Sequence, residues 1–282
     1  DQHGAYAMTI PEILAKAGDA RREIDFTELH IVGGLHPTLP FEYYLEMLSS
    51  LRDLMPGVHL QAFTAVEIAH LASISGLTVR ETLERLRDAG LGSIPGGGAE
   101  VFAERVRTEL CPVKLSPDGW IEIMRTAHAL GIRSNATMLY GHVETAEEKV
   151  EHLVRLRGLQ DETRGFLAFI PLAYHAQGTD LGQVDGRSGP FGVEDLKTIA
   201  GSRLMLDTSP HVKAFWIMLG LKLAQVSLHF GADDFDGTVV EEKITHSAGA
   251  KTPEGLSVSE IVGMIEETGT VPVERDTLYN RV

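Results

Sequence analysis

Cysteine is nearly absent from this chain of 282 residues, in which Cys111 is the only one. A single thiol excludes internal disulfides, and also any metal site built from cysteine alone within these residues. Basic side chains are also scarce: there are 25 Lys and Arg against 40 Asp and Glu, giving a formal net charge of −15. This balance excludes a nonspecific nucleic-acid binder, because neutralising phosphates needs a basic face.

Signals for membranes and export are missing as well. No apolar run is long enough to span a bilayer, and the first residues lack the pattern of a signal peptide. We therefore expect a soluble, cytoplasmic protein with no membrane partner. Residue 1 is Asp and not Met, so we expect the gene product to extend upstream.

What the chain does contain is a regular alternation of short apolar stretches with amphipathic helical ones. Strand starts recur about every 30–40 residues, the length of one strand–helix unit. Residues 211–219 fit either a strand or a helix. The seven predicted strands cover residues 29–34, 58–67, 91–100, 132–141, 165–175, 211–219 and 234–242.

Helices are predicted between these strands from their start signals. Several begin at a proline, and others begin with a capping box, in which a hydroxyl residue is followed three positions later by Glu. A further helix is predicted over residues 10–20, ahead of the first strand. The capping boxes are Thr78 with Glu81, Thr145 with Glu148, and Ser257 with Glu260.

This alternation predicts an α/β fold, a (β/α)8 TIM-type barrel. A closed barrel of this kind needs eight strands, and the helix over residues 10–20 has no strand before it. We therefore expect one barrel domain over residues 1–282 that includes the C-terminal strand–helix elements and lacks the first strand and its loop. An open doubly wound sheet is the alternative, but no compact GxGxxG turn supports a dinucleotide site.

Polar residues and glycines gather where the predicted strands end, which is where barrel enzymes build their active sites. Each has a second interpretation: a glycine pair can simply close a turn, and a histidine at a strand end supports a loop as readily as it contacts a ligand. Three glycines in a row exceed what a turn needs and favour a closely approaching ligand. These strand-end residues are Gly33, Gly34, His36, Thr64, Glu67, Gly96, Gly97, Gly98, Glu100, Asn135, Thr137, Tyr140, Gly141, His142, Glu144, Tyr174, His175, Asp233, Asp234, Asp236 and Glu241.

Several blocks, in this order, resemble one family. The blocks "HIVGGLHPTLPFEYYLEML", "PGGGAEVFAERVR", "SNATMLYGHVETAEEKVEHLVRLRGLQDET" and "PVERDTLYN" are similar to the aminofutalosine synthase family of radical S-adenosylmethionine (SAM) enzymes. The likeness runs from about residue 4 to the C-terminus. The related cyclic dehypoxanthine futalosine synthase and the FO synthase subunit remain alternatives.

The resemblance implies an activity and its cofactors. Enzymes of this family add the 5′-deoxyadenosyl radical of SAM to 3-[(1-carboxyvinyl)oxy]benzoate, with loss of CO2, to give aminofutalosine in menaquinone biosynthesis. The family also carries a [4Fe–4S] cluster on a CxxxCxxC motif, whose cysteines we expect upstream of residue 1. The implied partners are this small-molecule substrate and an electron donor such as flavodoxin or ferredoxin, and a homodimer is left open.

The resemblance also suggests roles for the strand-end residues. SAM is expected to contact the backbone of Gly33 and Gly34, and Glu100 is expected to accept hydrogen bonds from its ribose. The two substrate carboxylates need cationic or strong donor partners. The predicted cofactor-binding residues are Gly33, Gly34, Thr64, Gly97, Gly98, Glu100, Tyr140 and Gly141, and the predicted catalytic residues are His36, Asn135 and Arg275.

Two rival interpretations follow from the same residues. A metal-dependent barrel hydrolase would place zinc on strand-end histidines and an aspartate, although no HxH pair occurs anywhere in the chain. The other rival is a pseudoenzyme that binds SAM without cleaving it. The zinc ligands would be His36, His142, His175 and Asp234.

Overall fold

Strands and helices alternate along the chain in the computed structural model, which describes residues 6–176, 189–239 and 255–282. Six strands pair side by side in the order in which they occur, and every pair is parallel. Next to the last strand, Lys213 forms an isolated parallel bridge with Asp234, which adds one more position in the same order. The strands are β1 (Glu28–Ile31), β2 (His59–Ala62), β3 (Ser93–Ile94), β4 (Arg133–Tyr140), β5 (Phe166–Ala173) and β6 (His211–Val212).

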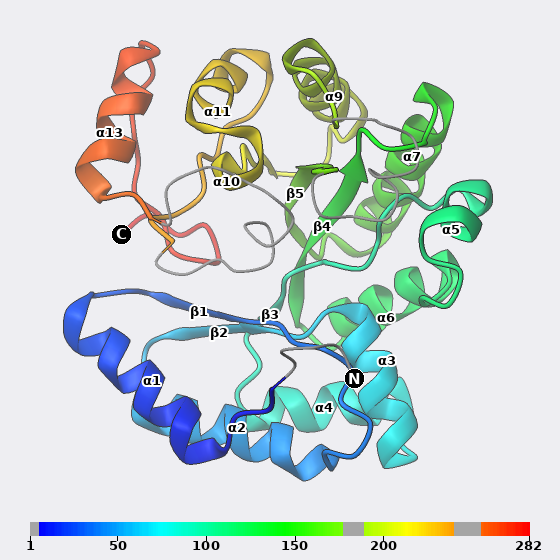
Figure 1. The fold of residues 1–282 in the computed structure, drawn as a ribbon, viewed down its shortest axis with the longest axis vertical. Helices are drawn as coiled ribbons and strands as arrows, with labels where there is room; N and C mark the ends of the chain where they lie inside the picture. Colours follow the sequence, from blue (N-terminus) through cyan, green and yellow to red (C-terminus); the bar gives the residue numbers. More distant parts are fainter. Residues whose placement is uncertain (1–5, 177–188, 240–254) are drawn as a thin grey trace.

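The helices surround this sheet on its outer side (Figure 1). With the parallel sheet inside and helices outside, the chain has the α/β TIM-barrel-like fold that its sequence predicts. The helices are α1 (Ile10–Glu23), α2 (Phe41–Leu54), α3 (Ala65–Ser75), α4 (Val79–Ala89), α5 (Glu104–Leu110), α6 (Pro117–Ala129), α7 (Ala146–Thr163), α9 (Gly192–Met205), α10 (Trp216–Leu219), α11 (Leu221–Ser227), the 3-10 helix η1 (Leu228–Phe230) and α13 (Val258–Glu267).

Capping boxes start five of these helices, and the three predicted ones are confirmed at α4, α7 and α13. In each, the hydroxyl of the N-cap residue accepts the N3 backbone N–H while the N3 glutamate accepts the N–H of the cap. The box at α3, formed by Thr64 and Glu67, was not predicted as a helix start.

Several predicted strands differ from the structure, and the one predicted over residues 91–100 shortens to Ser93–Ile94. The strand predicted over residues 58–67 ends at Ala62, because Thr64 and Glu67 already begin α3. The ambiguous stretch 211–219 divides into β6 and then α10, which begins at Trp216. Of the strand predicted over residues 234–242, the described part pairs only at Asp234, and its Glu241 lies outside the described residues.

Apolar side chains fill the layer between the sheet and the helices. Leu60 and Ala62 alternate along β2 with His59 and Gln61, so one face of the strand joins the core and the other faces the barrel interior, here called the lumen. Each large apolar side chain buried in this layer contributes about 1.5–3 kcal/mol. Hydrophobic burial therefore holds the strands in place from outside and leaves the lumen to polar groups.

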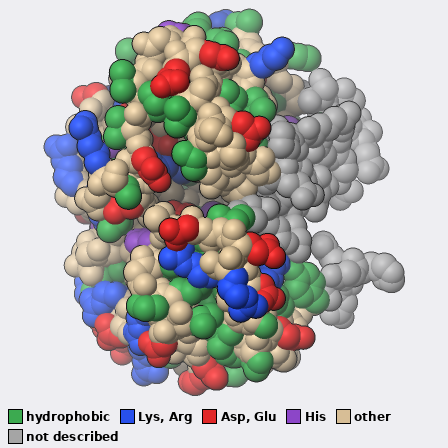
Figure 2. All heavy atoms as spheres, turned by 90° about the vertical axis from the view of Figure 1, so that its left-hand side faces the viewer, with side chains coloured by type: hydrophobic (Ala, Val, Ile, Leu, Met, Phe, Trp, Pro, Cys, Tyr) green, Lys and Arg blue, Asp and Glu red, His purple; other side chains and the backbone are tan. Residues whose placement is uncertain are grey.

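One side of the barrel is open. Within the described residues, β1 at one end of the sheet does not pair with the Asp234 position at the other end. Figure 2 looks at this side and shows a hollow that crosses the surface between the upper and lower halves of the molecule. No helix among the described residues is long and apolar enough to cross a membrane.

Candidate active site

The carboxyl ends of the parallel strands bring the predicted site residues to one edge of the sheet. Gly33 and His36 follow β1, Thr64 follows β2, Glu100 follows β3, and Gly141 follows β4. Strand ends on one edge of a parallel sheet form the mouth of a barrel. The predicted gathering at this mouth is therefore supported by the observed topology.

Glu67 joins the loops that follow β1 and β2. One carboxylate oxygen accepts the N–H of Gly33 at 3.0 Å, and the other accepts both the N–H and the hydroxyl of Thr64 at 2.8 Å each. The residue is only 7% exposed, and burial raises its pKa above the ordinary glutamate value despite these bonds. The hydroxyl of Thr64 is thus used by the helix cap and by Glu67.

The backbone of Gly33 and Gly34 remains open on its other side. A Cβ added to Gly34 would have no heavy atom within 4 Å, and both glycines are exposed. No donor in the described part of the chain bonds to either carbonyl oxygen. Two free carbonyls on an uncovered backbone can accept hydrogen bonds from a ligand ammonium group.

The glycine triplet after β3 has neighbours within the protein. A Cβ on Gly96 would lie 2.3 Å from the carbonyl oxygen of Asn135, and one on Gly98 would lie 2.6 Å from a methyl carbon of Val66. Both glycines have φ values of +87° and +83°, which side-chain-bearing residues rarely adopt. Gly97 is less crowded, with Thr64 Cγ2 at 3.0 Å. Packing accounts for the triplet, so it is no longer a signal for a ligand, and the predicted ligand contacts of Gly97 and Gly98 stay predictions.

Glu100 keeps one carboxylate oxygen for a ligand. Its Oε1 pairs with Lys114 at 2.6 Å, while Oε2 has no partner among the described residues. The residue has φ +50°, and its carbonyl accepts the N–H of Leu139 at 3.1 Å. Such a left-handed backbone at a residue other than glycine is uncommon and is held here by a bond to β4.

Tyr140 points away from the mouth. Its ring is fully buried, and its hydroxyl donates to Asp195 of α9 at 2.5 Å, so burial and this carboxylate raise its pKa. Gly141 has φ +88°, and its N–H donates to Glu144 at 2.6 Å. A contact between this stretch and adenine is thus restricted to the backbone.

His36 lies at the mouth with a fixed tautomer. Its Nδ1 accepts the backbone N–H groups of Thr38 at 3.3 Å and Leu39 at 3.1 Å. An Nδ1 that accepts cannot carry a proton, so the proton of the neutral ring lies on Nε2. Nε2 has no partner among the described residues and is free to donate to an anion.

Asn135 faces the lumen from β4. It is 5% exposed, yet its side-chain amide bonds to no described residue. Because every fully buried side-chain nitrogen and oxygen in the described chain has a partner, the amide of Asn135 must border accessible space. It therefore offers a donor and an acceptor within the barrel.

Other polar lumen residues were missed in the sequence. Gln61 of β2 is 4% exposed and donates to the hydroxyl of Ser93 on β3 at 3.1 Å, and the ring of His59 lies 2.8 Å from the same hydroxyl. The available signal was period-two alternation: His59 and Gln61 occupy every second position of an otherwise apolar strand.

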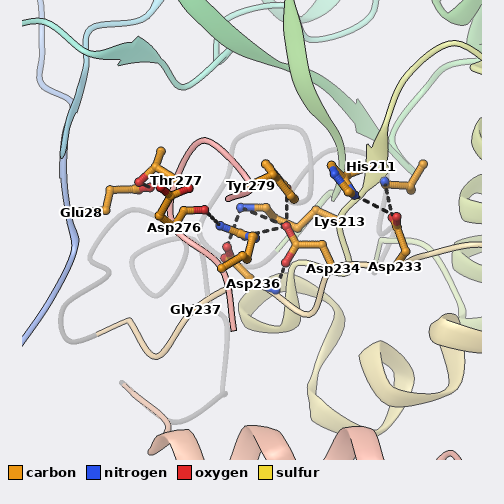
Figure 3. Close-up of polar contacts among 12 residues, drawn as sticks. Glu28, His211, Lys213, Asp233, Asp234, Asp236, Gly237, Asp276, Thr277 and Tyr279 are labelled. Carbon is orange, nitrogen blue, oxygen red and sulfur yellow. Dashed lines mark hydrogen bonds and ion pairs between the residues drawn. The ribbon is translucent and has the colours of Figure 1, made fainter. Parts of the chain in front are cut away.

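Arg275 belongs to a half-buried charged cluster with Lys213, Asp234 and Asp236, and Figure 3 shows these three partners. Its guanidinium donates to Asp234 at 2.6 Å and to the carbonyl of Asp276 at 3.1 Å. Lys213 pairs with Asp236 at 2.6 Å beside it, and Tyr279 also donates to Asp234. Burial alone would raise the pKa of Asp234, but the charges of Lys213 and Arg275 lower it. Asp234 orients Arg275, so this guanidinium is already paired within the protein.

The described residues contain no set of groups suited to a metal ion. Nowhere in that part of the chain do three His, Cys, Asp or Glu side chains converge as ligands, so the predicted zinc site is wrong there. His142 and His175 instead pair with the carbonyls of Leu139 and Met218 through Nε2. Cys111 is buried, and as one thiol it does not fit a cluster that needs three cysteines.

Two protein-family models match the chain. "Radical SAM superfamily" covers residues 1–156, and "CofH/MqnC C-terminal region" covers residues 163–282. Among solved structures, methylornithine synthase superimposes with a TM-score of 0.67 at 16% identity, over 97% of this chain and 76% of the other. At that identity the likeness supports the barrel fold alone.

Curated relatives match over the whole length. Aminodeoxyfutalosine synthase of Thermus thermophilus is 48% identical, covering 100% of this chain and 76% of the relative. The Streptomyces coelicolor enzyme of the same name is 46% identical, over 98% and 73%. The 5-amino-6-(D-ribitylamino)uracil–L-tyrosine 4-hydroxyphenyl transferase of Methanopyrus kandleri is 42% identical, over 100% and 77%. The chain therefore belongs to the radical SAM superfamily, whose enzymes use SAM and a [4Fe–4S] cluster, and within it to the family of aminodeoxyfutalosine synthase and the CofH/MqnC enzymes.

Proposed function

We propose that this enzyme joins the 5′-deoxyadenosyl group of SAM to the enol-ether carbon of 3-[(1-carboxyvinyl)oxy]benzoate, with loss of CO2, to give aminofutalosine in menaquinone biosynthesis. The observation that carries this proposal is the similarity of this chain, over 100% and 98% of its residues, to two bacterial aminodeoxyfutalosine synthases, with identities above that to the archaeal transferase. A carbon–sulfur bond and a carbon–carboxylate bond break, a carbon–carbon bond forms, and the aryl group migrates from oxygen to carbon. No net electron is consumed.

SAM, when bound, supplies the adenosyl group. The free carbonyls of Gly33 and Gly34 accept hydrogen bonds from its ammonium, and the open space above Gly34 admits its methionine part. The unpaired Oε2 of Glu100 accepts from the ribose hydroxyls. Glu67 fixes the Gly33 loop relative to Thr64, so these groups need little reorganisation on binding. Gly97, Gly98 and the backbone of Tyr140 and Gly141 line the rest of the SAM site.

The substrate carries two carboxylates, and two neutral donors at the site are free for them. They are Nε2–H of His36 at the mouth and the side-chain amide of Asn135 in the lumen. Arg275 is better suited to an anchoring role, because Asp234 and the carbonyl of Asp276 accept two of its five N–H donors and Asp234 balances its charge. Cys111 alone does not fit a [4Fe–4S] cluster, so the residues named above contact only SAM and the substrate. Flavodoxin or ferredoxin as electron donor, and a homodimer, stay predictions.

The test is an anaerobic assay of the full-length gene product, reconstituted with iron and sulfide, followed by mass analysis of the products. With SAM and the enolpyruvyl benzoate we expect an adduct that has gained the adenosyl group and lost CO2. A parallel reaction with L-tyrosine and 5-amino-6-(D-ribitylamino)uracil serves as the control. Product from the control pair alone would overturn the proposal, and SAM binding without cleavage would identify a pseudoenzyme.

A further inference from the structure

The last residues of the chain form a small, self-bonded hairpin, here called the C-terminal hairpin (residues 274–282). Arg275 and Arg281 pair as an antiparallel bridge, and Val282 donates to the carbonyl of Glu274 at 3.2 Å. The carboxylate of Asp276 accepts the N–H groups of Leu278 at 2.9 Å and of Asn280 at 2.8 Å within the turn. These local bonds define the shape of the hairpin.

Three residues of this hairpin contact the barrel, and two of them lie between its bridged residues Arg275 and Arg281. Arg275 donates to Asp234, and Thr277 donates to Glu28 of β1 at 2.6 Å. Tyr279 donates to Asp234. Asp234 and Glu28 belong to the two ends of the sheet that do not pair with each other, so the hairpin links the two ends of the sheet across the open side (Figure 3).

Tyr279 is the most constrained of these contacts. Its ring stacks on His211 with centroids 3.9 Å apart and an interplanar angle of 6°, and the guanidinium of Arg275 lies 4.2 Å from the ring centroid. Its backbone has φ +65°, which is uncommon for a residue with a side chain. The ring is therefore held between two groups, while its hydroxyl is held by a carboxylate that is 8% exposed.

Two of the three anchoring points, Glu28 and His211, lie at the amino ends of their strands, opposite the mouth, and the third, Asp234, pairs with Lys213 directly after β6. Glu28 and His211 are the first residues of β1 and β6, whereas Gly33, His36 and Glu100 follow the carboxyl ends of their strands. The charged side chains around Tyr279 balance, because Lys213 and Arg275 face Asp234 and Asp236. Charged groups that pair with one another in this way can close a lumen with less demand for ions or loose water.

We propose that the C-terminal hairpin is the floor of the reaction chamber and that Tyr279 is its positioning residue. The stacking on His211 and the bond to Asp234 fix the hairpin beneath the substrate, and the fixed floor keeps water and stray hydrogen donors from the adenosyl group during transfer. The identity of the substrate above the floor rests on the proposed function, but the placement of the floor does not.

The experiment compares Tyr279→Phe and Thr277→Val with wild type, in the full-length reconstituted enzyme. Tyr43→Phe is the matched control, because it also removes one tyrosine hydroxyl bond, from Tyr43 to the carbonyl of Met8 at 2.6 Å, outside the lumen. The first measurement is hydrogen–deuterium exchange over residues 274–282 without substrate. The second is the ratio of released 5′-deoxyadenosine to adenosylated product.

In Tyr279→Phe we expect the hydrogen–deuterium exchange rate of residues 274–282 to rise about tenfold, and the ratio of released 5′-deoxyadenosine to adenosylated product to rise about as much. This is the size expected when a hydrogen bond to a charged group is lost. Thr277→Val should raise both by a smaller factor, and Tyr43→Phe should change neither. An unchanged ratio in Tyr279→Phe overturns the proposal, as does an equal rise in Tyr43→Phe. If wild type forms no adduct from the enolpyruvyl benzoate, the proposed function fails. The placement of the floor is then tested only by comparing the hydrogen–deuterium exchange rates of Tyr279→Phe and Tyr43→Phe.

Discussion

Single residues at the mouth of the barrel differ in whether the protein has already used their polar groups. Thr64, Tyr140 and Arg275 bond to other parts of the chain. Gly34 and Asn135 keep their carbonyl or amide free within the described structure. The backbone of Gly34 is open to water, whereas an unused amide such as that of Asn135, which is 5% exposed, is costly unless a ligand or water satisfies it. Gly34 and Asn135 are therefore the better candidates for ligand contacts.

Substituting Gly34 tests the SAM site. In Gly34→Val the branched side chain enters space that no protein atom occupies within 4 Å. We expect the free energy of unfolding to change by less than about 0.5 kcal/mol. The dissociation constant for SAM, measured by calorimetry, should rise more than about tenfold because the side chain fills the ligand's space. Gly34→Ala should have a smaller effect. Unchanged SAM affinity in Gly34→Val would rule out the proposed contact between SAM and the backbone of Gly34.

Substituting Asn135 tests the substrate carboxylate contact. Asn135→Asp keeps the size of the side chain but places a negative charge in the lumen. Like charges in a poorly solvated site repel, so we expect KM for the enolpyruvyl benzoate to rise at least about tenfold. SAM affinity should stay within about twofold. Asn135→Ala, which removes the amide without adding charge, should raise KM less, and equal values for the two variants would contradict a carboxylate neighbour.

At the scale of elements, the same capping box serves different purposes in two neighbouring helices. In α4, Glu81 bonds to Thr78 and nothing else is attached to it in the described structure. In α3, Glu67 also bonds to Gly33, 34 residues earlier, and so ties the end of β1 to the start of the helix. A local helix signal thus becomes a connection between two strand ends.

This difference predicts unequal costs for one substitution. Glu81→Gln, at an exposed cap, should lower the free energy of unfolding by about 0.5–1 kcal/mol. Glu67→Gln should lower it by about 2 kcal/mol, because a buried amide has one acceptor oxygen where three donors converge. Urea unfolding measures both. The dissociation constant for SAM should change in Glu67→Gln and stay the same in Glu81→Gln. Equal losses of stability in the two variants, with no change in SAM affinity, would argue against a role of Glu67 in connecting the two strand ends.

Much of the fold follows from local patterns in the sequence. The capping boxes of α4, α7 and α13 and the apolar strands β4 and β5 are visible in the sequence because each signal lies within a few residues. The short helix α5 and the end of β2 were missed, since α5 has no side-chain cap and the cap of α3 lies inside an apolar stretch.

The site was predicted less completely than the fold. Strand ends and their glycines were identified because barrel topology assigns them one edge. Contacts such as Glu67 with Gly33, or Tyr279 with Asp234, join residues 34 and 45 positions apart, and no local pattern specifies them. The glycine triplet was attributed to a ligand for the same reason, since Val66 and Asn135 come near it only in the folded chain.

At the scale of the whole molecule, buried neutral histidines make stability depend on pH. Burial lowers the pKa of His152 to about 3 and that of His128 to about 4. His152 also accepts the N–H of Phe102 at 3.2 Å through Nδ1, which requires an unprotonated nitrogen. Below about pH 6.5 the unfolded chain protonates these rings while the folded chain does not, so protons favour the unfolded state.

The free energy of unfolding should therefore fall as the pH decreases from about 6.5 toward 4. For His152 the loss is on the order of 2–3 kcal/mol between pH 7 and pH 4.5. His152→Gln cannot titrate and should show a shallower fall in urea unfolding measured across this range. His229→Gln, at an exposed position, is the control and should keep the wild-type slope. Identical slopes in all three proteins would refute the assignment.

The bond between Thr277 and Glu28 joins residues 249 positions apart. β1 therefore leaves the ribosome long before Thr277 has been synthesised. Until then, β1 is an exposed edge of the nascent sheet. Contacts of such long sequence separation form late and slowly. Newly made chains consequently pass through a period in which holdase chaperones or self-association compete for that edge of the sheet, and synthesis of residues 274–282 ends it.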